Sequence, residues 1–106
     1  ASGRIERNPA LSGSVCDAIV TPQPGDLTFP ILRRLCGPGL TVTDDEALRA
    51  VAIAARHLRI VAEPGGAVAL AAALFRPDDI AGGAVVITVS GGNIDAAMLA
   101  RALMPG

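Results

Sequence analysis

The stretch AVVITVSGGNIDAAMLARAL, residues 84–103, decides the fold expected for this chain. Its first six residues form a continuous, largely apolar run of strand length, which is typical of a strand covered on both faces. The run stops at Ser90-Gly91-Gly92-Asn93, and residues 94–103 then have the pattern of a helix. A buried strand that leads into a helix predicts an α/β fold in which helices pack on a mostly parallel sheet.

Two more helices are predicted upstream of this strand. The segment EPGGAVALAAALF (63–75) can begin with Pro64 at its first helical position, and its Ala-rich body predicts burial on all sides. The segment RPDDIAGG (76–83) is expected to be a turn. The earlier helix begins at a capping box formed by Thr43 and Glu46 and extends to about residue 60.

Helical spacing places the apolar residues of this earlier helix on one face, which consists of Leu48, Val51, Ala52, Ala55 and Leu58. The polar side carries Arg49, Arg56, Arg59 and His57. His57 is the only histidine, and the local sequence offers no carboxylate or nucleophile beside it, so we expect a solvated side chain.

The N-terminal part of the chain is expected to be mostly irregular. Residues 1–14 are rich in Gly, Ser, Asn and Pro and predict a surface connector, and 15–20 form a short apolar turn. Residues 21–26 predict a loop, and 27–35 predict a short helix with Pro30 in its first turn. One strong strand is too little sheet for so many helices, so we expect this chain to be an incomplete part of a larger sheet.

Composition excludes several classes of protein. A net charge of −1 with few aromatic residues disfavours nucleic-acid binding, and no apolar run is long enough to cross a membrane. All nine basic residues are Arg, so the chain contains no Lys. Cys16 and Cys36 have neither zinc-site nor disulfide spacing, and we expect both to be buried or half-buried thiols in a reducing, cytoplasmic compartment.

Two residues are candidates for chemistry. Ser90 ends the predicted strand, where ligands bind in open α/β sheets, and the glycines after it would let a flat ring or a phosphate approach the backbone. Glu63 lies at a helix N-terminus, which stabilises a negative charge. Alternatively, Ser90 lies in a tight turn without any role in binding, and Glu63 is an ordinary acidic residue at the start of a helix. The acids Asp78, Asp79 and Asp95 are interpreted as turn and helix-start residues.

The order TVTDDEALRAV, EPGGAVALAAAL and AVVITVSGGNID, preceded by SVCDAI and TPQPGDLTF, resembles the carboxyl-terminal part of the threonine dehydratase and serine racemase family. These are pyridoxal-phosphate enzymes of fold type II. The resemblance covers roughly residues 3–104 and implies a tryptophan-synthase-β-like, three-layer αβα domain. Residues 15–106 would then be the carboxyl-terminal part of its large cofactor-binding domain.

The resemblance also implies roles for the two candidates. The serine that matches Ser90 hydrogen-bonds the pyridine nitrogen of the cofactor, and the glutamate that matches Glu63 lies beside the ring. The family's Schiff-base lysine and its glycine-rich phosphate loop lie upstream of the matching part. This chain therefore matches no catalytic residue and no metal ligand, and we expect it to be inactive alone.

The function implied is that of a pyridoxal-phosphate-dependent dehydratase that converts threonine or serine to a 2-oxo acid and ammonia. A hydroxyaspartate dehydratase or an amino-acid racemase remains open on the same scaffold. The expected partners are a hydroxy amino acid, the rest of the enzyme chain and further copies of the enzyme, with no nucleic acid or membrane. The alternative is a non-catalytic, stand-alone α/β module or degenerate paralogue, which should hide its apolar surface.

Overall fold

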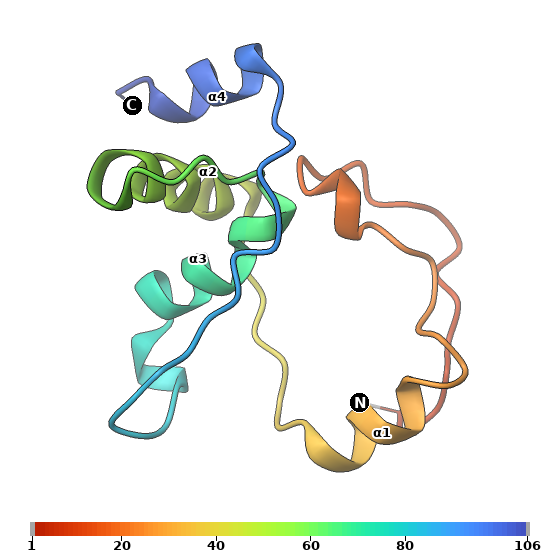
Figure 1. The fold of residues 1–106 in the computed structure, drawn as a ribbon. Helices are drawn as coiled ribbons and strands as arrows, with labels where there is room; N and C mark the ends of the chain where they lie inside the picture. Colours follow the sequence, from red (N-terminus) through yellow and green to blue (C-terminus); the bar gives the residue numbers. More distant parts are fainter. Residues whose placement is uncertain (1, 106) are drawn as a thin grey trace.

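Three helices pack together in the computed structural model, which describes residues 2–105 (Figure 1). Helix α2 (Asp44–Ile53) lies between α3 (Val68–Phe75) and α4 (Ala96–Leu103) and contacts both. Helix α1 (Phe29–Leu35) lies apart from them, within the long irregular N-terminal segment. Ala1 and Gly106, the outer ends of the expected connector and domain, lie outside the described residues.

The core of the molecule is small and rich in alanine. Its largest fully buried side chain is Val51, on α2. Because alanine is short, the backbones of packed helices can approach one another closely. The buried cluster consists of Ala50, Val51, Ala54, Ala62, Ala67, Leu70 and Ala71.

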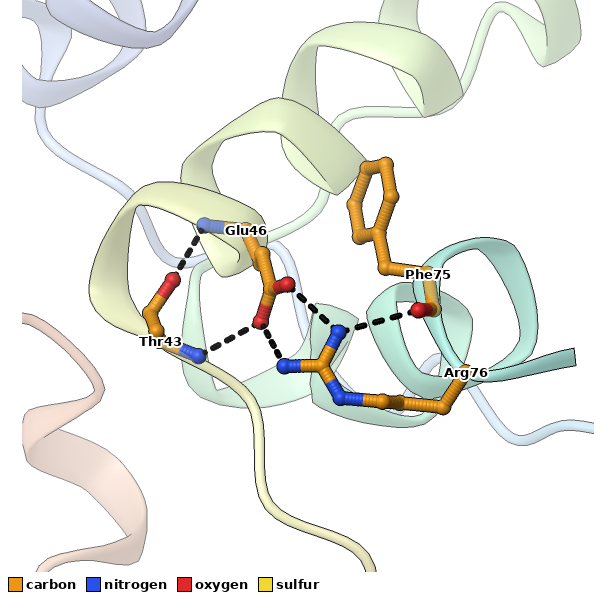
Figure 2. A network of polar contacts seen from close by, with 4 residues as sticks. All are labelled: Thr43, Glu46, Phe75 and Arg76. Atoms are coloured by element: carbon orange, nitrogen blue, oxygen red, sulfur yellow. Dashed lines mark hydrogen bonds and ion pairs between the residues drawn. The ribbon is translucent and has the colours of Figure 1, made fainter. Parts of the chain in front are cut away.

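The capping box at the start of α2 is confirmed. The Thr43 hydroxyl accepts a hydrogen bond from the Glu46 backbone N–H at 3.1 Å, and the Thr43 N–H donates to Glu46 Oε2 at 2.8 Å (Figure 2). Each contact satisfies a backbone donor that a helix start leaves free.

The end of this helix differs from the prediction. The helix continues from α2 into a π-helical turn, Ala54–Leu58, and Arg59 then takes a left-handed conformation with φ 59°. A π turn contains more residues than an α turn, so it rotates the following side chains away from the α-helical stripe. The assignment of Leu58 to the apolar face is therefore wrong, since this side chain is 55% exposed.

Glu46 also joins the start of α2 to the end of α3. Arg76 donates to Glu46 Oε1 at 2.6 Å and to Glu46 Oε2 at 2.9 Å, and it also donates to the Phe75 carbonyl at 2.9 Å (Figure 2). The guanidinium of Arg49 lies 4.3 Å from the centre of the Phe75 ring. The paired geometry of Arg76 and Glu46 is the strong form of this ion pair.

This ion pair predicts a stability that falls in acid. Hydrogen bonds from Arg76, and then the backbone bond from Thr43, hold the pKa of the Glu46 carboxyl below its ordinary value of 4.5. The stabilisation is therefore complete above that value and is lost as the pH falls through the lower folded-state pKa. We expect Glu46→Gln to flatten the acid side of a plot of thermal unfolding midpoint against pH.

The control for this measurement is Glu6→Gln. Glu6 faces Arg4 at 3.9 Å, but both side chains are highly exposed, and such pairs contribute little to stability. Its profile should match that of the unaltered protein. A Glu46→Gln profile that also matched would contradict the assigned role of this carboxyl.

Helix α3 begins differently from the prediction. Pro64 precedes a 3₁₀ turn, Gly65–Ala67, and the regular α-helix starts only at Val68. The prediction of burial on all sides is wrong for the helix body, where Leu70 and Ala71 are buried but Leu74 is 40% exposed. The side chains of Val68, Ala69, Ala72, Ala73 and Phe75 are half-buried, so the described residues cover α3 only in part.

The predicted strand at residues 84–89 is not formed, and the described residues contain helices but no strands. The segment crosses the molecule as a long non-helical stretch that passes α3 and leads to α4 (Figure 1). Ile87 and Val89 pack against the core, whereas Val86 is 95% exposed. A strand needs a neighbour to share its backbone hydrogen bonds, and residues 2–105 do not supply one.

The remaining helices follow their sequence signals. Helix α4 begins after Asp95, whose carboxylate accepts from the Met98 backbone N–H at 2.7 Å, so the helix-start role of Asp95 is confirmed. Helix α1 carries Pro30 in its first turn, as predicted. Residues Pro77–Asp79 form a 3₁₀ turn in the expected turn region. None of the described helices has the length and apolar character needed to span a bilayer.

Candidate functional site

The structure brings the two predicted site segments together. The backbone N–H of Glu63 donates to the Gly91 carbonyl at 2.9 Å, and the Ile94 N–H donates to the Gly92 carbonyl at 2.9 Å. Glu63 is half-buried, whereas Ser90 is exposed. The serine turn is therefore anchored to the segment that leads into α3, and its hydroxyl-bearing residue faces solvent.

Glycines allow these two segments to approach each other closely. A Cβ atom on Gly91 would fall on the carboxylate of Glu63, and one on Gly92 would lie 2.5 Å from the Val61 carbonyl oxygen. A Cβ atom on Gly66 would lie 2.9 Å from both the backbone nitrogen and the backbone oxygen of Gly91. The segments are thus in backbone contact, and the space freed by these glycines is filled from within the chain.

A small pocket of about 60 Å³ adjoins this contact. Its lining includes the acidic residues Asp17, Glu63 and Asp95 and the amide residue Asn93. Sequence reasoning did not select Asp17 or Asn93, because nothing local indicates that the turn Asp17–Ile19 contacts the start of α3. The lining residues are Val15, Asp17, Glu63, Pro64, Asn93, Ile94, Asp95 and Met98, so Ser90 lies outside the pocket.

Other reactive residues lie outside this region. His57 is exposed on the π-helical turn, as predicted. Cys16 is buried, and burial is the main cause that raises the pKa of its thiol, so it is a poor nucleophile. Cys36 is exposed, which contradicts the prediction that both thiols are covered. Residues 2–105 contain no group of His, Cys, Asp or Glu side chains arranged to hold a metal ion.

A larger hollow of about 630 Å³ lies beside α1. It is lined in part by Arg4, Arg33 and Cys36, and neither Ser90 nor Glu63 contributes to it. This hollow and the predicted site therefore belong to different parts of the chain.

Comparisons with known proteins identify what this arrangement is similar to. A family model described as "Pyridoxal-phosphate dependent enzyme" matches residues 2–91. An L-threonine ammonia-lyase of Thermotoga maritima is 36% identical over 103 residues, which cover 97% of this chain and 24% of that protein. A serine racemase of Dictyostelium discoideum is 34% identical, with 96% of this chain and 32% of that protein covered.

Two further relatives extend the comparison. A β-hydroxyaspartate dehydratase of Paracoccus denitrificans is 38% identical over 82 residues, which cover 77% of this chain and 26% of that protein. The crystal structure of a threonine deaminase from T.th. superposes with a TM-score of 0.76 at 35% identity, covering 89% of this chain and 31% of that one. The chain thus spans about a quarter to a third of the length of these relatives.

Proposed function

Because this chain belongs to the pyridoxal-phosphate-dependent enzyme family, we propose that the whole protein is an ammonia-lyase that converts a β-hydroxy amino acid to a 2-oxo acid and ammonia. The chain is related to threonine ammonia-lyases, serine racemases and hydroxyaspartate dehydratases. The observation that carries the proposal is the contact between the Glu63 and Ser90 segments, which brings together the two motifs on which the resemblance depends.

The residues of this chain fit one part of a pyridoxal-phosphate site. Ser90 offers an exposed hydroxyl at the end of a segment that packs on the core, and Glu63 lies against the same turn. We assign Ser90 as the hydrogen-bond partner of the ring nitrogen and Glu63 as a residue beside the ring. When bound, pyridoxal phosphate withdraws electron density from the α-carbon of an amino acid. A neutral hydroxyl at the ring nitrogen keeps that withdrawal moderate, which suits elimination or racemisation.

The amine that binds the cofactor lies outside this chain in the proposed enzyme. All nine basic residues are Arg, and a guanidinium is always protonated and cannot act as the required nucleophile. The 106-residue chain alone is therefore proposed to be inactive. It would contribute the ring-nitrogen contact to a site that other residues of the protein complete.

Exposed apolar side chains support the idea that other protein covers this chain. Val86 is 95% exposed, Leu27 is 87% exposed and Leu35 is 70% exposed. The Cα radius of gyration is 14.9 Å, larger than the roughly 13 Å expected for a compact domain of this length. These features favour a part of a larger enzyme over a stand-alone module, and we propose that the rest of the enzyme and a further copy of it provide the covering surfaces.

A substrate panel tests the proposed reaction. The purified full-length protein with pyridoxal phosphate should release 2-oxo acid and ammonia from L-threonine, L-serine or a hydroxyaspartate. L-alanine is the control, because it has no β-hydroxyl to eliminate. Chiral analysis of the remaining amino acid separates a racemase from a lyase. Cofactor-loaded protein that released no 2-oxo acid from any of these substrates would contradict the proposal, whether or not it racemised them.

A further inference from the structure

The turn that carries Ser90 is contacted at two points by one short segment, residues 63–66. At the first point, the backbone N–H of Glu63 donates to the Gly91 carbonyl, and the Glu63 carboxylate occupies the position that a Gly91 side chain would need. Both the backbone N–H and the side-chain carboxylate of Glu63 therefore lie against Gly91. A displacement of the turn away from Glu63 would break this hydrogen bond, and a displacement toward it would require the Glu63 carboxylate to move.

Gly66 makes the second contact with this turn. A Cβ atom on Gly66 would lie 2.9 Å from the Gly91 nitrogen and oxygen and 3.4 Å from the Ser90 nitrogen. The obstructing atoms are backbone, which cannot rotate away as the end of a side chain can. The backbones therefore approach as closely as glycine permits, and the Ser90 backbone belongs to this contact.

Gly65 has no such neighbour. A Cβ atom on Gly65 would meet the Ala18 Cβ and the Ile19 Cγ2 atoms at 3.5 Å, which is an ordinary van der Waals contact. Two adjacent glycines that look equivalent in the sequence thus have different packing. Only Gly66 is required for the approach to the serine turn.

We propose that Glu63 and Gly66 are positioning residues that fix where the Ser90 hydroxyl lies. In this role the Glu63 carboxylate fills the space where a Gly91 side chain would lie and does not transfer a proton. This inference rests on the proposed function for the identity of the ligand that Ser90 meets. The contacts of Glu63 and Gly66 with Gly91, which we call the Gly91 clamp, lie within this chain, so the clamp is testable without the cofactor.

The first test compares two neighbouring substitutions in the full-length protein. Gly66→Ala should speed hydrogen exchange at the Glu63 amide in the cofactor-free protein, because the added methyl group pushes Gly91 away from its donor. It should also weaken pyridoxal-phosphate binding by roughly tenfold or more, as expected for an overpacked methyl group. Gly65→Ala adds the same methyl group and should leave both measurements unchanged.

The second test determines whether the Glu63 carboxylate occupies the space where a Gly91 side chain would lie. In the unaltered background, Gly91→Ala should weaken cofactor binding because its methyl group meets the Glu63 carboxylate. In a Glu63→Ala background, the same substitution should cost little further affinity, since the obstructing carboxylate is gone. Equal losses in the two backgrounds would show that the methyl group meets something other than Glu63 and would overturn the proposal.

The two tests separate this inference from the proposed function. A full-length protein that binds no pyridoxal phosphate would refute the proposed function, and amide exchange at Glu63 would then decide the Gly91 clamp alone. Unchanged exchange in Gly66→Ala would refute the clamp whether or not the cofactor binds. Faster exchange without loss of affinity in a cofactor-binding protein would show that the clamp does not position Ser90.

Discussion

Replacing Ser90 with alanine should weaken the binding of pyridoxal phosphate to the full-length protein by about 5- to 150-fold, or about 1–3 kcal/mol. The substitution removes the only hydroxyl group at the tip of the segment and leaves the glycine turn unchanged. A ring nitrogen enclosed without a partner loses its hydrogen bond to water and gains nothing in exchange. Titration of the cofactor-free protein, followed by absorbance, measures this affinity directly.

Thr88→Ala is the matched control for this measurement. Thr88 is also exposed and lies two residues before Ser90 on the same segment, so both substitutions remove one hydroxyl from similar surroundings. We expect Thr88→Ala to bind the cofactor normally. Ser90→Ala with the affinity and turnover of the unaltered protein would contradict the assignment of Ser90 as the partner of the ring nitrogen.

The 106-residue chain alone should form no side-chain imine with pyridoxal phosphate, and borohydride should therefore fix no cofactor on a side chain. Formation of an imine requires an unprotonated amine, and the nine basic side chains of this chain are all guanidinium groups. The amino terminus carries the one remaining amine, and acetylation removes it. Mass spectrometry of the digested protein should then show no peptide with the added mass of the cofactor.

Arg101→Lys shows whether this assay detects a lysine at all. Arg101 is exposed on α4, so the substitution supplies an accessible amine without disturbing the core. We expect weak labelling at that position alone. Labelling of any side chain in the acetylated, unaltered chain would contradict the proposal that the amine partner lies elsewhere in the enzyme.

Three of the helix starts could be predicted from the sequence, although that of α3 could not. The capping box of Thr43 and Glu46 and the cap at Asp95 formed as expected, and Pro30 lies in the first turn of α1. Each of these signals depends on hydrogen bonds or sterics between residues three or four positions apart. Such interactions form in almost any tertiary context.

The errors arose where a distant partner decides the outcome. Residues 84–89 have the composition of a buried strand, but a strand also needs a neighbour, and the described residues provide none. Leu58 was misplaced because a π-helical turn changed the helical register before it. Neither the absence of a neighbouring strand nor a single π-helical turn changes the spacing of apolar residues along the sequence, so the sequence pattern could not reveal either.

The same distinction holds for the candidate site, where some features follow from the local sequence and others from the tertiary structure. The sequence alone determined that Ser90 follows an apolar segment, that Glu63 precedes a helix, and that no lysine is present. Only the tertiary structure decided that Glu63 contacts Gly91, that Gly66 is required where Gly65 is not, and that Asp17 shares the pocket with Glu63. The physical reason is that residue identities and short-range hydrogen bonds are properties of the local chain. Contacts between distant segments depend instead on how the helices pack.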